Sequence, residues 1–202
     1  MVHNIVFDIG GVMAEWQPEL WFRRRFGEER GPRVLAAAMG NSFWGEQVDR
    51  GIVSEEEFFS RQRKEYPQLA AALSVTEKEW REILRPREDT AKLIRRLKAA
   101  GQRVYYLSNF PKKTFLELRD TMPVVGEMDG GVVSWEVHRI KPEPEIYRLL
   151  LERYGLRGSE TVFADDTPSN VEAAKAAGLW AWRFDGAAGF EEYLKHQLGI
   201  EF

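Results

Sequence analysis

Four polar positions along this chain combine residue types that could carry out chemistry together. Asp8, Ser108 and the pair Asp165 and Asp166 each stand at the end of a short apolar run, which is typical of a buried strand. Lys141 precedes a predicted helix that begins with proline. Because open parallel sheets bind their ligands at the carboxyl ends of the strands, these side chains are expected to meet at that edge. Two acidic centres, a hydroxyl and an ammonium group suit a divalent cation and a phosphate group.

The chemistry that these groups suit is phosphoryl transfer. An aspartate such as Asp8 can attack phosphorus and form an aspartyl-phosphate, provided that a cation offsets the repulsion between carboxylate and phosphate. Mg²⁺ prefers oxygen ligands from one or two carboxylates, a carbonyl, the phosphate and water. The Ser108 hydroxyl can hold phosphoryl oxygens, and Lys141 can neutralise charge that builds up in the transition state.

The composition limits the alternatives. The 202 residues include no cysteine and three histidines but 32 aspartates and glutamates, which excludes disulfide, thiolate, cysteine–zinc and iron–sulfur chemistry. A net charge of −3 argues against a nucleic-acid or membrane partner, and no apolar run approaches the roughly 18 residues of a membrane span. Because the first residues run directly into the apolar Ile5–Phe7, we expect no targeting segment and a cytoplasmic location.

The elements that must position these side chains alternate between strands and helices. Four short apolar runs predict strands, at residues 5–7, 103–107, 161–164 and 180–184. Amphipathic segments predict helices over 88–100 and 144–154. Two helix ends are nearly identical, Lys98–Gly101 and Lys175–Gly178, and each is followed by a strand. This repetition of helix, glycine and strand predicts a three-layer, Rossmann-like α/β fold with a mostly parallel sheet.

A long segment between the first two predicted strands has a different character. Residues 15–85 carry helix signals without a convincing strand, including capping boxes that begin at Ser54 and Thr76. We therefore predict an inserted α-helical cap over 15–85 and an α/β core formed by 1–14 and 86–202.

Sequence motifs at the chemical positions stand in a recognisable order. They are Phe7–Val12, Leu107–Asn109, Lys141–Pro142, and Phe163–Asp166 followed by Asn170. In this order they resemble the four motifs of the haloacid dehalogenase-like (HAD) hydrolases, and the resemblance covers nearly the whole chain. The helical insert looks like the cap that subclass I members carry after the first motif. Within the superfamily the chain is similar to small bacterial sugar-phosphate phosphatases of the alpha-D-glucose-1-phosphate phosphatase type.

The resemblance implies a Mg²⁺ site and a nucleophile. Asp8 would attack phosphorus and also bind the metal, and the backbone carbonyl of Gly10 would be a second ligand. Asp166 would complete the protein ligands, with Asp165 supporting it from beside. The implied reaction is hydrolysis of a small phosphate monoester through an aspartyl-phosphate on Asp8.

The resemblance also implies how substrate is held. Ser108 and Asn109 would contact phosphate, and Lys141 would orient both nucleophile and phosphate. Trp44 and Glu15, in the segment predicted as the cap, are our candidates for contacts with the rest of the substrate.

Position 10 departs from many phosphatases of this family, which carry there a second aspartate that acts as general acid and base. The residue here is Gly10. Losing a general acid costs on the order of 10²–10⁴ in rate, most where the leaving oxygen is most basic. We therefore expect sugar phosphates with good leaving groups, such as sugar 1-phosphates, or a replacement acid such as Glu15 or His138.

Two other functions remain open at this point. A protein that keeps the fold but turns over slowly could be a phosphosugar-binding or regulatory protein. A haloacid dehalogenase would use Asp8 to attack carbon without a metal, but it has no evident use for the paired Asp165 and Asp166. The expected partner is a small phosphorylated metabolite, and we expect a monomer or a weak homodimer.

Overall fold

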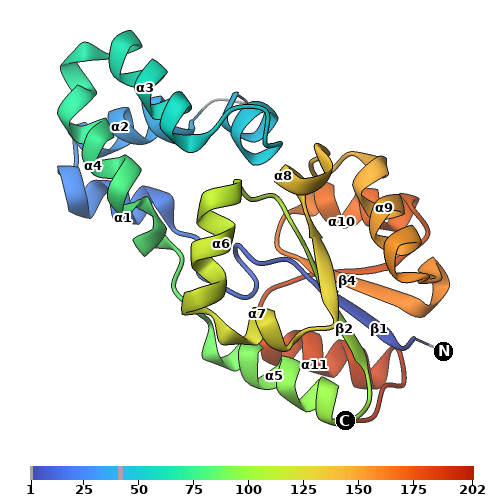
Figure 1. The fold of residues 1–202 in the computed structure, drawn as a ribbon. Helices are drawn as coiled ribbons and strands as arrows, with labels where there is room; N and C mark the ends of the chain where they lie inside the picture. Colours follow the sequence, from blue (N-terminus) through green and yellow to red (C-terminus); the bar gives the residue numbers. More distant parts are fainter. Residues whose placement is uncertain (1, 41–42) are drawn as a thin grey trace.

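A parallel sheet forms the centre of the molecule. The computed structural model describes residues 2–40 and 43–202. Within these residues five parallel strands lie in the order β3-β2-β1-β4-β5 (Figure 1). The strands are β1 (Asn4–Phe7), β2 (Arg103–Ser108), β3 (Gly130–Val133), β4 (Thr161–Asp165) and β5 (Trp180–Arg183). The four strands predicted from apolar runs are confirmed, and β1 is buried along its whole length.

The strand β3 has no counterpart in the sequence prediction, because half of its four residues are glycines. Both glycines are required by close neighbours. A side chain at Gly131 would begin 2.2 Å from the Tyr106 ring, and one at Gly130 would begin 2.5 Å from the Tyr154 hydroxyl. That hydroxyl donates to the Gly131 carbonyl at 2.9 Å and accepts from the Gly131 N–H at 2.8 Å. The strand is therefore specified by tertiary contacts rather than by an apolar pattern.

Helices cover both faces of the sheet. They are α5 (Glu88–Ala99), α6 (Lys112–Thr121), α7 (Pro123–Glu127), α8 (Ser134–Val137), α9 (Pro144–Tyr154), η4 (Gly158–Glu160), α10 (Pro168–Ala176) and α11 (Ala187–His196). Successive residues of a strand point to opposite faces. Phe7 accordingly belongs to a cluster with Leu97 of α5 and Phe190 of α11, whereas Val6 belongs to one with Tyr147 of α9 and Val171 of α10. The predicted three-layer α/β architecture is thereby confirmed.

The segment between β1 and α5 is helical in its described elements. These are α1 (Pro18–Phe26), α2 (Arg30–Met39), the π-helix η1 (Trp44–Asp49), α3 (Glu55–Glu65), η2 (Pro67–Leu69), α4 (Ala70–Glu79) and η3 (Trp80–Ile83). They lie together at one side of the sheet, in blue to green in Figure 1. The two chain segments that lead to them run side by side, because the Glu15 N–H donates to the Arg85 carbonyl at 2.8 Å. In the described part of the chain, no helix combines the length and apolar character needed to cross a bilayer.

One of the two predicted capping boxes is confirmed and one is wrong. Ser54 caps α3, since its hydroxyl accepts from the Glu57 N–H at 3.1 Å. Thr76 instead lies inside α4, fully buried, and its hydroxyl donates to the Ala72 carbonyl at 3.0 Å. A threonine that satisfies its hydroxyl four residues back can sit within a helix, so the capping pattern at this position was misleading.

Candidate functional site

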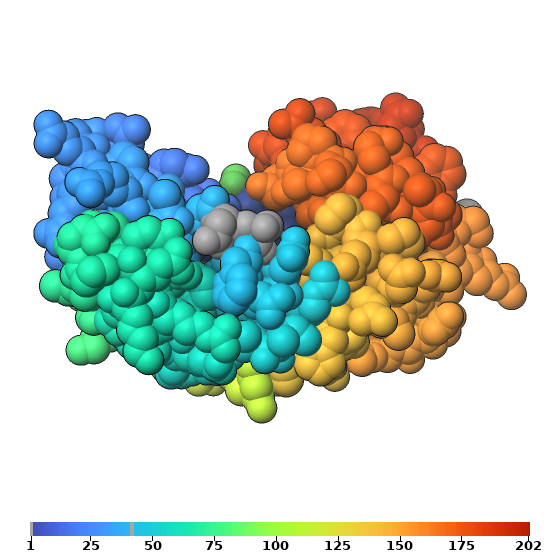
Figure 2. Space-filling model, turned by 90° about the horizontal axis from the view of Figure 1, so that it is seen from above, coloured from blue at the N-terminus to red at the C-terminus, as the bar shows by residue number. Residues whose placement is uncertain are grey.

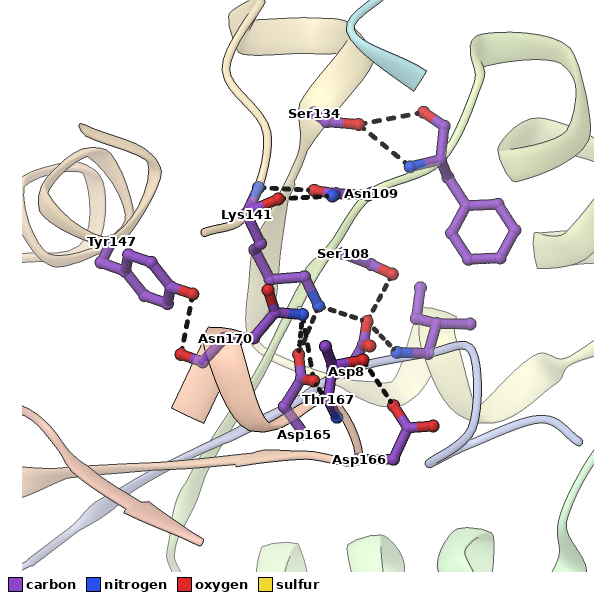
Figure 3. Close-up of polar contacts among 12 residues, drawn as sticks. Asp8, Ser108, Asn109, Ser134, Lys141, Tyr147, Asp165, Asp166, Thr167 and Asn170 are labelled. Carbon is purple, nitrogen blue, oxygen red and sulfur yellow. Dashed lines mark hydrogen bonds and ion pairs between the residues drawn. The ribbon is translucent and has the colours of Figure 1, made fainter. Parts of the chain in front are cut away.

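Three strand ends and one loop bring charged and polar side chains into contact (Figure 3). Asp8 follows β1, Ser108 ends β2 and Asp165 ends β4, so the strand order makes them neighbours. The Lys141 Nζ lies 2.8 Å from Asp8 Oδ1 and 2.6 Å from Asp165 Oδ2. Ser108 Oγ donates to Asp8 Oδ1 at 2.6 Å, and the Ile9 N–H donates to the same oxygen at 2.7 Å. The carboxyl edge of the sheet therefore holds a buried cluster of carboxylates around one ammonium group.

The loop that carries Lys141 is held by a side-chain amide. Asn109 Oδ1 accepts from the Lys141 N–H at 2.8 Å, and Asn109 Nδ2 donates to the Lys141 carbonyl at 3.0 Å. Both polar groups of the amide are engaged in this clamp. Asn109 therefore positions Lys141, whereas the contact with phosphate that the sequence suggested for it stays a prediction.

Asp165 is fully buried and saturated with hydrogen bonds. Its Oδ1 accepts from the Thr167 N–H at 2.8 Å, and Asn170 Nδ2 lies 3.1 Å from both of its oxygens. The Asn170 carbonyl in turn accepts from the Tyr147 hydroxyl at 2.9 Å. With Lys141 as a further donor, Asp165 is a fixed counter-charge that holds the ammonium group beside Asp8.

Burial and charge shift the ionisation of this cluster. Burial raises the pKa of Asp8 to about 7, while Lys141 acts against this rise and Asp165 adds to it. Burial acts to lower the pKa of Lys141, but attraction to Asp8 and Asp165 overcomes it and the pKa is raised. Asp166 is half-buried, and burial together with repulsion from Asp165 raises its pKa. The protein alone therefore supplies too little positive charge to hold the pKa values of Asp8 and Asp166 at their ordinary level.

The donor set fits a Mg²⁺ ion. Among the described residues, Asp8, Asp165 and Asp166 each offer a carboxylate oxygen, and these atoms lie within 4.8 Å of one another. Gly11 makes room for this group, because it adopts a φ of +77° and a side chain there would begin 2.2 Å from Asp166 Oδ2. The Gly10 carbonyl belongs to a residue that lines the same cavity. One lysine offsets only part of the charge of three carboxylates, and a divalent cation can neutralise the rest. Oxygen atoms are also the ligands that Mg²⁺ prefers.

A cavity of about 250 Å³ opens above this cluster. Its polar lining comes from the sheet edge and includes Asp8, Ser108, Asn109, Lys141, Asp166, Thr167 and Asn170. Its remaining lining comes largely from the helical segment and consists of Trp16, Met39, Trp44, Asp49, Trp80, Phe110 and Pro111. The candidate Trp44 thus lines the cavity, and it also packs edge-on against Phe58 and Trp80 at ring separations of 5.0 and 5.5 Å.

Two residues proposed from sequence do not line this cavity. Glu15 is exposed and borders a neighbouring hollow together with Arg87 and Asp166. His138 is the left-handed residue that ends α8, and its Nδ1 lies 2.9 Å from the Arg50 carbonyl. It borders a larger hollow of about 600 Å³ between α3 and α6, which contains neither Asp8 nor Lys141. A role for either residue in proton transfer is therefore not supported by its position.

Several residues of the cavity were not assigned a role from the sequence. Asp49 follows Trp44 in the π-helix η1 and lines the cavity together with Asp8, but nothing in the sequence links two residues so far apart. Trp16 and Trp80 lie 6.3 Å apart as an edge-on aromatic pair, although they are separated by most of the helical segment. Only the fold of that segment brings them together.

Comparisons with known proteins agree with this geometry. Residues 2–178 match the family model described as haloacid dehalogenase-like hydrolase. A sesquiterpene phosphatase, astK, of Aspergillus oryzae is 28% identical over 174 residues, which cover 86% of this chain and 85% of that protein. A phosphorylated carbohydrates phosphatase of Thermotoga maritima is 26% identical over 189 residues, which cover 87% of this chain and 81% of the relative.

Solved structures share the fold at low sequence identity. A variant of a HAD family enzyme of Bacteroides thetaiotaomicron, in complex with magnesium and inorganic phosphate, superimposes with a TM-score of 0.73. It is 20% identical, and the match covers 92% of this chain and 95% of that one. An L-2-haloacid dehalogenase of Xanthobacter autotrophicus has a TM-score of 0.68 at 18% identity, covering 97% of this chain and 84% of its own.

Proposed function

Because this chain belongs to the haloacid dehalogenase-like hydrolases, we propose that it is a Mg²⁺-dependent phosphatase that hydrolyses a small phosphate monoester. The observation that carries the proposal is the buried contact of Lys141 with both Asp8 and Asp165, at 2.8 and 2.6 Å, on the floor of the cavity. It gives Asp8 a fixed orientation and a cationic neighbour that favours its ionised, nucleophilic form.

The chain's own residues define the reaction. Asp8 Oδ1 accepts hydrogen bonds from Ser108, Ile9 and Lys141, so that Oδ2 is the oxygen available to attack phosphorus. The bond from Asp8 to phosphorus forms as the alcohol leaves, and water then cleaves the aspartyl-phosphate. Lys141 can stabilise the negative charge on the phosphoryl oxygens. Mg²⁺ held by Asp8, Asp166 and the Gly10 carbonyl would supply the positive charge that lets a phosphate dianion approach a carboxylate.

For the substrate, we favour a sugar phosphate with a good leaving group. Because position 10 places no carboxylate beside Asp8, a leaving oxygen of low basicity, such as an anomeric one, needs the least help from an acid elsewhere in the cavity. The tryptophans of the cavity can stack on the apolar face of a sugar ring. Similarity to a phosphorylated carbohydrates phosphatase points in the same direction.

A phosphate of an apolar alcohol is a second candidate substrate. The side chains of Trp16, Trp44 and Trp80 form much of the cavity wall opposite the polar cluster. Such a wall favours burial of apolar surface over hydrogen bonding to several hydroxyl groups. The similarity to a sesquiterpene phosphatase supports this alternative.

We also propose a domain organisation, a cellular location and an oligomeric state for the enzyme. Residues 15–85 would act as a cap on the core formed by 1–14 and 86–202 and exclude water from the first step. We propose a cytoplasmic protein that acts as a monomer or weak homodimer on a phosphorylated metabolite.

A screen of phosphate monoesters tests the function. Sugar 1-phosphates, sugar 6-phosphates, prenyl phosphates and p-nitrophenyl phosphate are incubated with the protein and Mg²⁺, with Asp8→Asn as the blank. We expect release of inorganic phosphate that EDTA abolishes, with the highest kcat/KM for sugar 1-phosphates. Phosphate release no greater than with Asp8→Asn would contradict the proposal and favour a phosphosugar-binding protein. Release of halide from 2-haloacids in the presence of EDTA would instead indicate a dehalogenase.

A further inference from the structure

Cleavage of an alkyl phosphate leaves an alkoxide that needs a proton, and Gly10 provides no acid beside Asp8. We propose that Asp49, contributed by the π-helix η1, donates this proton to the leaving oxygen. This inference rests on the proposed phosphatase function and adds a catalytic residue to it. Of the titratable side chains that line the cavity in the described chain, Asp8, Lys141 and Asp166 are already assigned, and Asp49 is left.

Asp49 lines the same cavity of about 250 Å³ as Asp8. The side chains around it on that wall are apolar or aromatic, including Met39, Trp44 and Trp80. In this proposal the phosphoryl group lies against Asp8 and the alcohol points toward this wall. Asp49 is therefore the acidic side chain that the leaving oxygen would meet.

The backbone of Asp49 is fastened to the part of the sheet edge that carries Lys141. The Ser134 hydroxyl, at the start of α8, donates to the Asp49 carbonyl. The neighbouring Arg50 guanidinium lies 2.6 and 3.0 Å from the two carboxylate oxygens of Glu143. Figure 2 shows this contact as the cyan surface of the helical segment meeting the yellow surface of the sheet lobe. The proton donor and the lysine are thus positioned by one segment, residues 134–143.

A close backbone approach fixes this contact further. Gly51 adopts a φ of +75°, and a side chain there would begin 2.7 Å from the Trp135 carbonyl oxygen. The His138 Nδ1 lies 2.9 Å from the Arg50 carbonyl. Residues 49–51 therefore dock on α8 along their backbone, and this docking holds Asp49 at the wall of the cavity.

The ionisation of Asp49 suits a proton donor. Burial raises its pKa to about 8, and the Glu55 carboxylate adds to the rise. A hydrogen bond from Trp44 and the charge of Lys141 act in the opposite direction. Asp49 takes part in none of the ion pairs found among the described residues. The adjacent Arg50 pairs with Glu143. The raised pKa favours the protonated form of the carboxyl group, which can give up its proton to an alkoxide.

The proposed step balances in protons and electrons. As the Asp8 oxygen bonds to phosphorus, the bond from phosphorus to the leaving oxygen breaks, and its electron pair takes the proton of Asp49. In the second step the Asp49 carboxylate accepts a proton from water while that water attacks the aspartyl-phosphate. Inorganic phosphate leaves, the Asp8 carboxylate is restored and Asp49 is protonated again.

The test compares leaving groups of different basicity. For Asp49→Asn, kcat/KM toward an alkyl phosphate is expected to fall about 10²-fold or more, because the alkoxide leaves without a proton. For p-nitrophenyl phosphate, whose phenolate needs no proton, kcat/KM is expected to change less than about threefold. Glu46→Gln is the matched control, an exposed carboxylate in the same π-helix, and should behave as wild type. Equal losses on both substrates would overturn the proposal.

A second variant guards against a merely structural effect. A Cβ at Gly10 would meet no atom within 4 Å, so there is open space for the first atom of an aspartate side chain there. In the Asp49→Asn background, the Gly10→Asp change should raise kcat/KM toward alkyl phosphates at least tenfold. It should change kcat/KM toward p-nitrophenyl phosphate very little. Failure of this rescue while p-nitrophenyl phosphate is still cleaved would count against Asp49 as the acid. If the wild type cleaves no phosphate monoester, the proposed function itself fails.

Discussion

The two walls of the cavity are built on opposite principles. The wall at the sheet edge holds Asp8, Ser108 and Lys141, which are buried and joined, with Asp165 behind them, by contacts of 2.6 to 2.8 Å. The other wall, from the helical segment, consists of Met39 and three tryptophans that meet edge-on, Trp16, Trp44 and Trp80, with one carboxyl group at Asp49.

The difference suits one wall to binding the phosphoryl group and the other to binding the alcohol. A phosphoryl group is the same in every substrate, and its charge requires fixed dipoles and charges at defined positions. The alcohol differs between substrates, and an apolar wall can bind it through burial without a fixed set of hydrogen bonds. Changes on the first wall should therefore affect all substrates equally, and changes on the second should depend on the alcohol.

The largest expected effect is loss of the nucleophile. Asp8→Asn should reduce phosphate release from every substrate roughly 10⁴-fold or more, because the amide cannot form the acyl-phosphate. Steady-state kinetics with sugar phosphates and with p-nitrophenyl phosphate measure this. Activity within tenfold of wild type on either substrate would remove Asp8 from the mechanism.

Removing the buried cation should affect both activity and folding. Lys141→Met leaves Asp8 and Asp165 without their shared partner, and breaking a buried ion pair costs about 3–5 kcal/mol. We expect kcat to fall at least about 10²-fold for all leaving groups and the free energy of unfolding in urea to fall by that amount. Lys175→Met, which removes an exposed 2.9 Å pair with Glu172, is the control and should change stability by less than about 0.5 kcal/mol. Similar stability of the two variants would show that the cluster is not held by Lys141.

A smaller effect is expected where the two walls are joined. Arg50→Ala removes the paired contacts with Glu143 and should loosen the segment that carries Asp49. We expect kcat/KM toward alkyl phosphates to fall about tenfold, equivalent to about 1.4 kcal/mol, and to fall less for p-nitrophenyl phosphate. Arg61→Ala is the control, because Arg61 pairs with Glu57 on the exposed side of α3. An equal loss on both substrates would indicate that Arg50 supports the fold rather than the proton donor.

The last prediction concerns the stability of the fold as a function of pH and leaves activity aside. Burial raises the pKa of Asp49 to about 8, from an unfolded value near 4. As pH rises through this interval the unfolded chain loses a proton that the folded protein keeps, so the stability of the wild type falls. Asp49→Asn should remove this slope and raise Tm at pH 8, by about 2–4 °C for each 1 kcal/mol regained, with a smaller gain at pH 5. Thermal unfolding curves at both pH values test this, and parallel changes for Glu46→Gln would contradict it.

Much of the sheet edge can be predicted from the sequence. Asp8, Ser108 and Asp165 each end an apolar run, and parallel strands bring such ends to one edge. Strand β3 could not be found in this way, because Gly130 and Gly131 depend on contacts with aromatic rings from other elements. The capping pattern at Thr76 was misleading for a related reason, since burial inside α4 replaced the expected helix start.

The helical wall was much less predictable. Glu15 and Trp44 were both candidates from sequence, yet Trp44 lines the cavity and Glu15 lies on a neighbouring hollow. No amphipathic period and no sequence motif distinguishes Trp44 from Glu15. The packing of aromatic residues from distant helices decides which side chains face the substrate.

The amino-acid sequence was enough to predict the kind of chemistry and the edge of the sheet at which we propose that it occurs. It did so because strand ends, glycine turns and paired aspartates are local patterns whose position in a parallel sheet follows from the topology. The tertiary structure alone decided which side chain can take the place of a carboxylate at Gly10. Asp49 is held at the cavity by the docking of residues 49–51 on α8, and its raised pKa depends on burial and on the nearby Glu55 carboxylate. Burial and long-range contacts of this kind leave no periodic signal in the chain.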